Sequence, residues 1–337
     1  MRITALSGGI GGARFIRGLL RHLAPRRNES EVADHTGHEV TVIGNTADDI
    51  SLFGLRVCPD LDTLMYTLGS GIDDARGWGR SDEGWRAKEE LAAYGAEPDW
   101  FGLGDRDLAT HIVRTQLLAA GHPLSSVTAR LCARWRPGVR LLPMSDDRIE
   151  THIVIADPHE PTGRRTVHFQ EYWVRMQAAV PALEVIPVGI ATSVPAPGVL
   201  DAIADTDLVL LPPSNPVVSI GTILGVPGIR DAVARTRAPV VGLSPIVRGA
   251  PVRGMADAVL AAIGVDSSAA AVAAHYGSRS AGGILDGWLV DEADTAAVQV
   301  VEGLGIACRA VPLLMHDVAT TAAMAGEALA MAGRIRA

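Results

Sequence analysis

A cluster of glycines directly after a short apolar segment constrains this chain most. The segment from Ile3 to Leu6 predicts a buried strand, and four glycines follow within five positions, at Gly8, Gly9, Gly11 and Gly12. Residues 14–20 then repeat apolar side chains at helical spacing. A strand, a glycine turn and a helix N-terminus in this order offer free backbone N–H groups to an anion. The pattern predicts an α/β domain that begins with a phosphate-binding loop, and a tight turn without a ligand is the alternative.

The spacing of these glycines matches neither of the two common nucleotide motifs. The loop lacks the frame of G-x-G-x-x-G and of G-x-x-x-x-G-K-[ST], and it holds no lysine. An NAD-dependent dehydrogenase or a P-loop NTPase is therefore not favoured.

Apolar segments that end in polar loops recur along the chain and alternate with helical patterns. The segments expected to be strands are 40–43, 140–143, 151–156, 165–169, 185–188, 207–211, 240–243, 282–290 and 308–312. Helical patterns cover 60–70, 72–106, 107–135 and the tail from 320, and the polar stretch 25–39 predicts a surface loop. This alternation predicts a Rossmann-like, doubly wound α/β fold with a mainly parallel sheet. We expect one domain over residues 1–337, with a helical insertion at roughly 70–135.

Composition narrows the classes of function. Hydrophobic residues make up 48% and aromatic residues 4% of the chain, which fits an aliphatic core of parallel strands buried on both faces. A net charge of −8 disfavours a nucleic-acid surface, because such surfaces gather Lys and Arg. Three distant cysteines predict neither disulfides nor a zinc site. No apolar run approaches the ~18–20 residues of a membrane span, so we expect a cytoplasmic protein without membrane contact.

Three polar clusters come directly after expected strands. They are Gly8–Gly12, Asn45–Asp49 and Pro213–Asn215. Ligands of open α/β sheets bind outside the carboxyl ends of the strands, so the three clusters can line one crevice. Their convergence is stronger evidence for a site than any of the motifs alone.

Carboxylates gather at the same expected edge. Asp48 and Asp49 follow the second strand, and Asp60 and Asp62 lie at the start of a helix. Capping of that helix would explain Asp60 alone, but it does not require a second aspartate two residues later. Mg²⁺ binds through one or two carboxylates together with substrate phosphates. A metal role is therefore predicted for at least one of Asp49, Asp60 and Asp62.

The segment 103–111 is dense in charge. Asp107 and His111 are four residues apart on a helix and can pair. Arg106, Thr110 and Arg114 share one helix face, which could grip a phosphate or a carboxylate, because a guanidinium binds such groups with two hydrogen bonds. Ordinary surface ion pairs remain the alternative.

The loop at 213–221 is rigid and polar. Pro213 and Pro216 exclude a helix or a central strand, and Asn215 offers both a donor and an acceptor, which suits the edge of a base. Ser219 could open another helix N-terminus, and a capped turn is the alternative. No Ser-His-Asp or Cys-His arrangement stands out. A metal with phosphate-binding loops and no covalent nucleophile indicates phosphoryl-group chemistry.

Ordered motifs along nearly the whole chain resemble the CofD/FbiA family, the 2-phospho-L-lactate transferases of coenzyme F-420 biosynthesis. The segments Arg56-Val57-Cys58 and Gly77-Trp78-Gly79 look most like its actinobacterial branch. The motifs that carry the resemblance lie at 6–14, 59–63, 103–111, 142–147, 168–171, 213–221, 244–246 and 264–267.

The resemblance implies a Mg²⁺-dependent transfer and a Rossmann-like homodimer. A guanosine diphosphate that carries phospholactate, or phosphoenolpyruvate in the actinobacterial branch, would donate to the ribityl hydroxyl of the deazaflavin Fo. GMP would leave, and the product would be (dehydro) coenzyme F-420-0. The sequence does not decide between the lactyl, enolpyruvyl and glyceryl donors.

The resemblance also implies roles for particular residues. The donor phosphates and guanosine would contact Gly8, Gly9, Gly11, Gly12, Ser214, Asn215 and Ser219. The acceptor Fo would contact Asn45, Thr46, Asp62 and Asp105. Mg²⁺ would be held by Asp49, Asp60 and Asp62, and the predicted catalytic residues are Asp62, Asp49 and Arg106.

A second hypothesis is a regulatory protein of similar fold that binds a nucleotide sugar and transfers nothing. It would need the glycine loop and the 213–221 loop, but no site for Fo. The sequence Asp60-Leu61-Asp62 and the tryptophan-rich segment 72–106 favour the enzyme.

Overall fold

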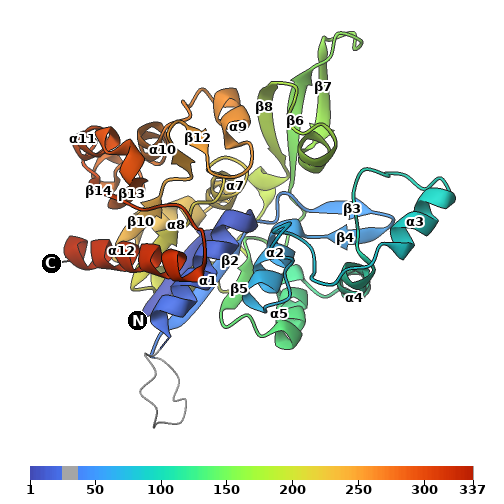
Figure 1. The fold of residues 1–337 in the computed structure, drawn as a ribbon, viewed down its shortest axis with the longest axis horizontal. Helices are drawn as coiled ribbons and strands as arrows, with labels where there is room; N and C mark the ends of the chain where they lie inside the picture. Colours follow the sequence, from blue (N-terminus) through green and yellow to red (C-terminus); the bar gives the residue numbers. More distant parts are fainter. Residues whose placement is uncertain (25–36, 337) are drawn as a thin grey trace.

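A seven-stranded parallel sheet forms the centre of the protein in a computed structural model that describes residues 1–24 and 37–336 (Figure 1). Residues 25–36 of the expected surface loop lie outside the described residues. The strand order is β14-β13-β10-β9-β1-β2-β5. The strands are β1 (Arg2–Ser7), β2 (Glu39–Gly44), β5 (Arg140–Pro143), β9 (Leu208–Leu211), β10 (Val240–Leu243), β13 (Gly287–Asp291) and β14 (Ala307–Val311). The expected α/β fold with a mainly parallel sheet is confirmed.

The direction of winding reverses between β1 and β9, which are neighbours in the sheet. From β1 the chain proceeds outward through β2 to β5, and it then returns to β9 and proceeds the other way to β14. A crevice opens at the carboxyl edge of a parallel sheet where the order reverses in this way. The fold therefore places the ends of β1 and β9 at the expected ligand position.

Alternate side chains of each strand enter two cores on opposite faces of the sheet. In β9, Leu208 and Leu210 pack on one face, and Val209 and Leu211 pack on the other. The first face is covered by α1 (Gly9–Leu23), α2 (Pro59–Leu68), α5 (Leu124–Trp135) and α12 (Val318–Arg336). The second is covered by α6 (Val199–Ala204), α7 (Ile220–Gly225), α8 (Ile229–Arg235), α9 (Ala256–Ala262), α10 (Ala269–Tyr276) and α11 (Ala296–Gly303). Burial on both faces explains the continuous apolar strands.

The crossover from β2 to β5 holds the expected helical insertion. Its further elements are β3 (Ile50–Leu52), β4 (Leu55–Val57), α3 (Arg86–Ala93) and α4 (Asp105–Ala119). The expectation of helix throughout 72–106 is wrong, because α3 is the one complete α-helix there, α4 begins only at Asp105, and glycines with positive φ, such as Gly77 and Gly79, interrupt the backbone. The β3–β4 hairpin was not expected; its two-residue turn has positive φ at both Phe53 and Gly54.

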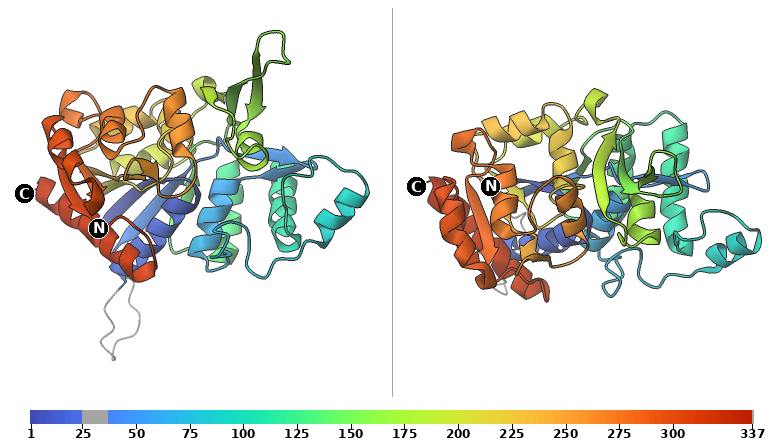
Figure 2. Two further views of the ribbon diagram at one scale, coloured as in Figure 1. Left: turned by 45° about the horizontal axis from the view of Figure 1, so that its top comes forward. Right: turned by 90° about the horizontal axis from the view of Figure 1, so that it is seen from above.

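Three of the expected strands form a separate antiparallel sheet, which projects from the body (Figures 1 and 2). They are β6 (Glu150–Ala156), β7 (Arg164–His168) and β8 (Ala182–Val188). Short links precede β6 and β7, and a parallel pairing would need a crossover of a dozen residues or more. The expected strand at 282–290 begins only at Gly287, since the backbone turns at Gly282 with φ +85°.

The remaining short elements are a β-hairpin and four helical turns. They are β11 (Ile246–Val247), β12 (Ala250–Pro251), η1 (Glu171–Arg175), η2 (Ile190–Thr192), η3 (Arg279–Ala281) and η4 (Glu292–Asp294). Within the described ranges, no helix combines the length and the hydropathy that a membrane span requires.

The close packing of α1 on α12 depends on Gly18. A Cβ atom there would lie 2.8 Å from the backbone carbonyl carbon of Thr321, whereas one at Gly333 of α12 would meet nothing within 4 Å. We expect Gly18→Ala to lower the free energy of unfolding by about 1–3 kcal/mol through overpacking. The control Gly333→Ala should raise it by roughly 0.5–1 kcal/mol. Urea denaturation of both variants checks the pair, and equal gains would contradict the packing argument.

Candidate functional site

The glycine loop packs directly against the loop that follows β9. A Cβ atom at Gly11 would lie 2.5 Å from the carbonyl oxygen of Pro213, and one at Gly12 would lie 2.5 Å from the Ser214 hydroxyl. The Gly8 N–H donates to that hydroxyl (3.2 Å), which in turn donates to the Gly8 carbonyl (2.8 Å). Because these positions lack a Cβ atom, the glycine loop and the loop after β9 can pack against each other at the switch point. The residues predicted to bind the donor substrate therefore lie close together.

The carboxylate of Asp60 lies at the N-terminus of α1. It accepts hydrogen bonds from the Gly9 N–H and from Asn45 Nδ2 (3.0 Å). Gly9 has φ +63°, and a Cβ atom at Gly8 would collide with the Asp60 carboxylate. An anionic group of the protein therefore occupies the place where the sequence predicts a ligand phosphate, since a helix N-terminus attracts negative charge.

Asn45 connects three elements around this carboxylate. While its Nδ2 donates to Asp60, its Oδ1 accepts from the Ala47 N–H (3.0 Å) and from the Thr222 hydroxyl of α7 (2.8 Å). The next predicted residue, Thr46, is also buried, and its hydroxyl has no hydrogen-bond partner among the described residues. Both polar atoms of the Asn45 side chain thus form hydrogen bonds within the site, whereas the Thr46 hydroxyl forms none with the described residues.

Asp48 and Asp60 form a buried acidic pair. Burial and then the charges of Asp60 and Asp49 raise the pKa of Asp48 well above its usual range. Burial likewise raises the pKa of Asp60 to about 6, against the hydrogen bonds from Asn45 and Gly9. Neither carboxylate forms an ion pair within residues 1–24 and 37–336, and Asp48 Oδ1 has no hydrogen-bond partner there. This part of the site carries negative charge that a cation would balance.

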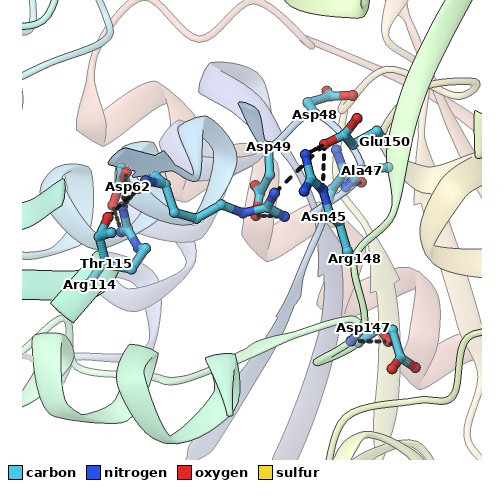
Figure 3. Close-up of polar contacts among 12 residues, drawn as sticks. Asn45, Ala47, Asp48, Asp49, Asp62, Arg114, Thr115, Asp147, Arg148 and Glu150 are labelled. Carbon is cyan, nitrogen blue, oxygen red and sulfur yellow. Dashed lines mark hydrogen bonds and ion pairs between the residues drawn. The ribbon is translucent and has the colours of Figure 1, made fainter. Parts of the chain in front are cut away.

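Asp49 and Asp62, in contrast, each face an arginine. Asp49 Oδ2 accepts from Arg56 (3.1 Å), and burial still raises the pKa of Asp49 to about 6 against the opposing effect of Arg56. Asp62 and Arg114 point toward one another in Figure 3 and form two hydrogen bonds, one of 3.1 Å from Nη1 to Oδ2. Burial disfavours the charge of Arg114, yet Asp62 raises the pKa of that guanidinium above its ordinary value.

The projecting sheet fixes the acidic loop through two side chains to which the sequence analysis gave no role. His168 Nε2 donates to the carbonyl of Asp49 (3.2 Å), and Gln170 donates to the carbonyl of Asp48 (3.1 Å). The direction of the first bond is determined, because His168 Nδ1 accepts the Gln170 N–H (3.0 Å). Burial lowers the pKa of His168, which favours this neutral form. The motif at 168–171 was the available signal.

Two of the predicted residues lie apart from the aspartates. Arg106 is half exposed and approaches Asp82 (3.9 Å) and the Ser81 carbonyl (3.4 Å). Asp105 accepts the Ala87 N–H (2.9 Å) and so stabilises the start of α3.

On the helix face that was expected to grip an anion, Thr110 and Arg114 are buried and Arg106 is not. Arg114 forms its ion pair with Asp62, a carboxylate of the protein itself. The predicted pair of Asp107 and His111 is confirmed, with 3.3 Å between Asp107 Oδ2 and His111 Nε2.

The 213–221 loop forms the capped turn that was the alternative to a binding loop, and a contact of Asn215 with a base stays a prediction. Asn215 Oδ1 accepts from the N–H groups of Val217 (2.9 Å) and Val218 (3.2 Å), as in a capped turn. Ser219 is buried, and its hydroxyl lies 2.7 Å from where a Cβ of Gly8 would be. The loop therefore adjoins the same backbone position as the Asp60 carboxylate, at the start of α1.

The residues fit a divalent cation that is shared with a ligand. Across the described parts of the chain, no three His, Cys, Asp or Glu side chains come close enough to enclose a metal ion by themselves. Asp48 and Asp60 nevertheless offer carboxylate oxygens without a basic partner. Mg²⁺ commonly binds through one or two carboxylates and takes its other ligands from water and phosphate.

Comparison with known proteins identifies the family. The sequence profile of the family described as 2-phospho-L-lactate transferase CofD matches residues 3–311. The chain belongs to the CofD family. It is accordingly a transferase, as the names of its relatives also indicate.

Several relatives are similar over their full length. A phosphoenolpyruvate transferase of Kitasatospora aureofaciens is 64% identical over 336 residues, which cover 100% of this chain and 99% of that protein. The phosphoenolpyruvate transferase of Thermobifida fusca is 61% identical over 332 residues, 98% of each chain. A crystal structure of a UPF0052 family member from Bacillus halodurans superposes with a TM-score of 0.60 at 16% identity, over 97% of this chain and 99% of that one. This last likeness shows that the fold is shared.

The buried charge of Asp60 should make the ligand-free protein less stable at neutral pH. Its pKa of about 6 exceeds the usual 3.8, so the folded state binds the proton more tightly and stability falls as pH rises from about 4 to about 6. We expect Asp60→Asn to raise the free energy of unfolding at pH 8 by up to roughly 3 kcal/mol, and to change it little at pH 4.

Denaturation of the metal-free protein at both pH values measures this effect. Asp317→Asn is a suitable control, because hydrogen bonds from Thr320 lower the pKa of Asp317 and predict a loss of stability at pH 8 instead. A less stable Asp60→Asn protein at pH 8 would show that the carboxylate is not under electrostatic strain.

Proposed function

We propose that this protein transfers a phosphoenolpyruvyl group from a guanosine diphosphate-linked donor to the ribityl hydroxyl of Fo, with Mg²⁺, in coenzyme F-420 biosynthesis. GMP and dehydro coenzyme F-420-0 are the products. The observation that carries the proposal is the acidic pair of Asp48 and Asp60 beside the α1 N-terminus, at the switch point of the sheet. The names of the full-length relatives favour the enolpyruvyl over the 2-phospho-L-lactyl donor.

The position of Asp60 supports the requirement for a metal. A donor phosphate at the α1 N-terminus would meet the Asp60 carboxylate, and two anions can share this place when a cation lies between them. Of the three aspartates predicted to bind the metal, we keep Asp60 as a ligand. We add Asp48, whose carboxylate lies beside it, as the second ligand. Asp49 and Asp62 would first have to leave Arg56 and Arg114. When bound, Mg²⁺ supplies neutralisation of the diphosphate charge.

The side chains around this centre divide into two groups. The glycine loop with Ser214, Asn215 and Ser219 would bind the guanosine diphosphate part. The acceptor Fo would lie on the side of Asn45, Thr46 and Asp62, with Asp105 and Arg106 at a greater remove, beside the 81–87 segment. We also propose that the protein is a soluble enzyme of the cytoplasm and acts as a homodimer.

The reaction needs a group that accepts a proton, and Asp49 suits this role better than Asp62. The Fo hydroxyl oxygen forms a bond to the phosphorus that carries the enolpyruvyl group, the bond to the GMP oxygen breaks, and the hydroxyl proton passes to a carboxylate. Both oxygens of Asp62 accept hydrogen bonds from Arg114, whereas Asp49 Oδ1 has no partner among the described residues. A pKa of about 6 places Asp49 near the value that suits a general base.

Incubation of the purified protein with Fo, Mg²⁺ and enolpyruvyl-diphosphoguanosine tests the proposal, with the lactyl donor in parallel. We expect metal-dependent formation of dehydro coenzyme F-420-0 and GMP by mass spectrometry, and slower turnover of the lactyl donor. No product with either donor, together with tight binding of a nucleotide sugar, would instead support the regulatory protein.

Substitution of the proposed base gives a second test. Asp49→Asn should lower kcat by about 10²–10⁴-fold, with donor binding retained, because proton transfer from the acceptor is lost. In the unsubstituted enzyme, kcat should fall as pH drops below about 6, where Asp49 becomes protonated. Glu150→Gln is the matched control, since Glu150 is the outer carboxylate beside the same Arg56 (3.9 Å). Equal activity of Asp49→Asn and Glu150→Gln would exclude this role.

A further inference from the structure

Five buried or nearly buried side chains form a closed ring between α2 and α4. Asp62 and Tyr66 lie one turn apart on α2. Asp62 bonds to Arg114, whose Nη1 lies 3.1 Å from His111 Nδ1. His111 Nε2 lies 3.3 Å from Asp107 Oδ2, and the Tyr66 hydroxyl donates to Asp107 Oδ1 (2.6 Å). The ring therefore begins at Asp62 and returns to α2 at Tyr66.

The geometry determines which nitrogen of His111 carries hydrogen. A guanidinium nitrogen can only donate, so His111 Nδ1 beside Arg114 must accept. Its Nε2 is then the nitrogen that carries the hydrogen, and it faces Asp107 Oδ2 at 3.3 Å without forming a hydrogen bond of good geometry. A hydrogen on Nδ1 would place a donor against a donor 3.1 Å away. The His111 ring therefore accepts on the side of Arg114 and carries its hydrogen on the side of Asp107.

Stability alone does not explain this ring of polar side chains, because apolar packing could join the two helices equally well. The Asp62 carboxylate and the Arg114 guanidinium are buried in it and Asp107 is nearly so, and buried ion pairs contribute little net stability against apolar packing of similar volume. One of the two carboxylates, Asp62, is a predicted site residue that follows Asp60 by two positions. Each oxygen of Asp62 accepts from one nitrogen of Arg114, which fixes the plane of the carboxylate.

We propose that His111 and Asp107 are positioning residues, which hold Arg114 and through it the orientation of Asp62 toward the acceptor substrate. Arg114 cannot rotate without losing His111, and His111 cannot rotate without losing Asp107. The role in catalysis rests on the proposed function, whereas the ring itself does not.

The direction of the bonds is tested by NMR of protein labelled with ¹⁵N at histidine. The His111 signals are identified by their loss in His111→Gln. We expect the hydrogen to be on Nε2 and Nδ1 to be unprotonated. A hydrogen on Nδ1, or on both nitrogens, would overturn the ring. This measurement needs no enzymatic activity.

Kinetics test the positioning role. His111→Leu removes the hydrogen bond from Arg114 and the polar contact with Asp107. We expect kcat to fall by about 10²-fold with little change in the KM of the donor, since a small misplacement of a positioned group has such effects. His111→Gln should restore most of kcat, because its amide oxygen can accept from Arg114 while its amide nitrogen donates to Asp107.

Leu124→Ala on α5 is the matched control. Leu124 is buried in the core that contains Tyr66, and the substitution should lower the free energy of unfolding by about 2–5 kcal/mol without lowering kcat. A kcat of His111→Leu equal to that of Leu124→Ala, or no recovery in His111→Gln, would overturn the positioning role. If His111→Leu does not fold, His111→Gln and the NMR experiment still decide. Failure of the unsubstituted protein to transfer any group would overturn the proposed function, and the NMR result would stand.

Discussion

The contact of the Asp60 carboxylate with the N-terminus of α1 is the interaction on which the site depends. It joins the first helix of the fold to α2, and Asn45 extends the connection to the end of β2 and to α7. Because no arginine of residues 1–24 and 37–336 forms an ion pair with Asp60, the contact is electrostatically costly despite its hydrogen bonds. The acidic loop after β2 adds the carboxylate of Asp48, and we propose that the two carboxylates share a cation.

The glycines of the first loop have a structural cause that the sequence analysis did not consider. Its spacing predicts a close approach of backbone and ligand, and the structure shows a close approach of backbone and protein. Gly11 and Gly12 admit the loop after β9, whereas Gly8 and Gly9 admit Asp60. The sequence alone does not distinguish the two causes, because both require the absence of a Cβ atom.

The parallel sheet could be predicted from the sequence, because it follows from the spacing of apolar and polar residues along the chain. Apolar strands followed by polar loops indicated the parallel sheet and its ligand-binding edge, and all three expected polar clusters lie there. The partners of the aspartates could not be predicted in this way, since Asp62 and Arg114 are 52 residues apart and meet only through packing of α2 on the insertion. Arg106 and Arg114 have the same helical phase, and only the tertiary structure decides which of them is buried.

Asp60 and Asp62 illustrate how one turn of helix can serve two purposes. Their side chains leave α2 in different directions, so Asp60 meets the uncharged groups of Asn45 and Gly9 and Asp62 meets a guanidinium. The first carboxylate can accept a cation without losing an existing ion pair, whereas the second is held rigidly and keeps its direction. A transferase that positions a phosphate and an acceptor needs both kinds of carboxylate.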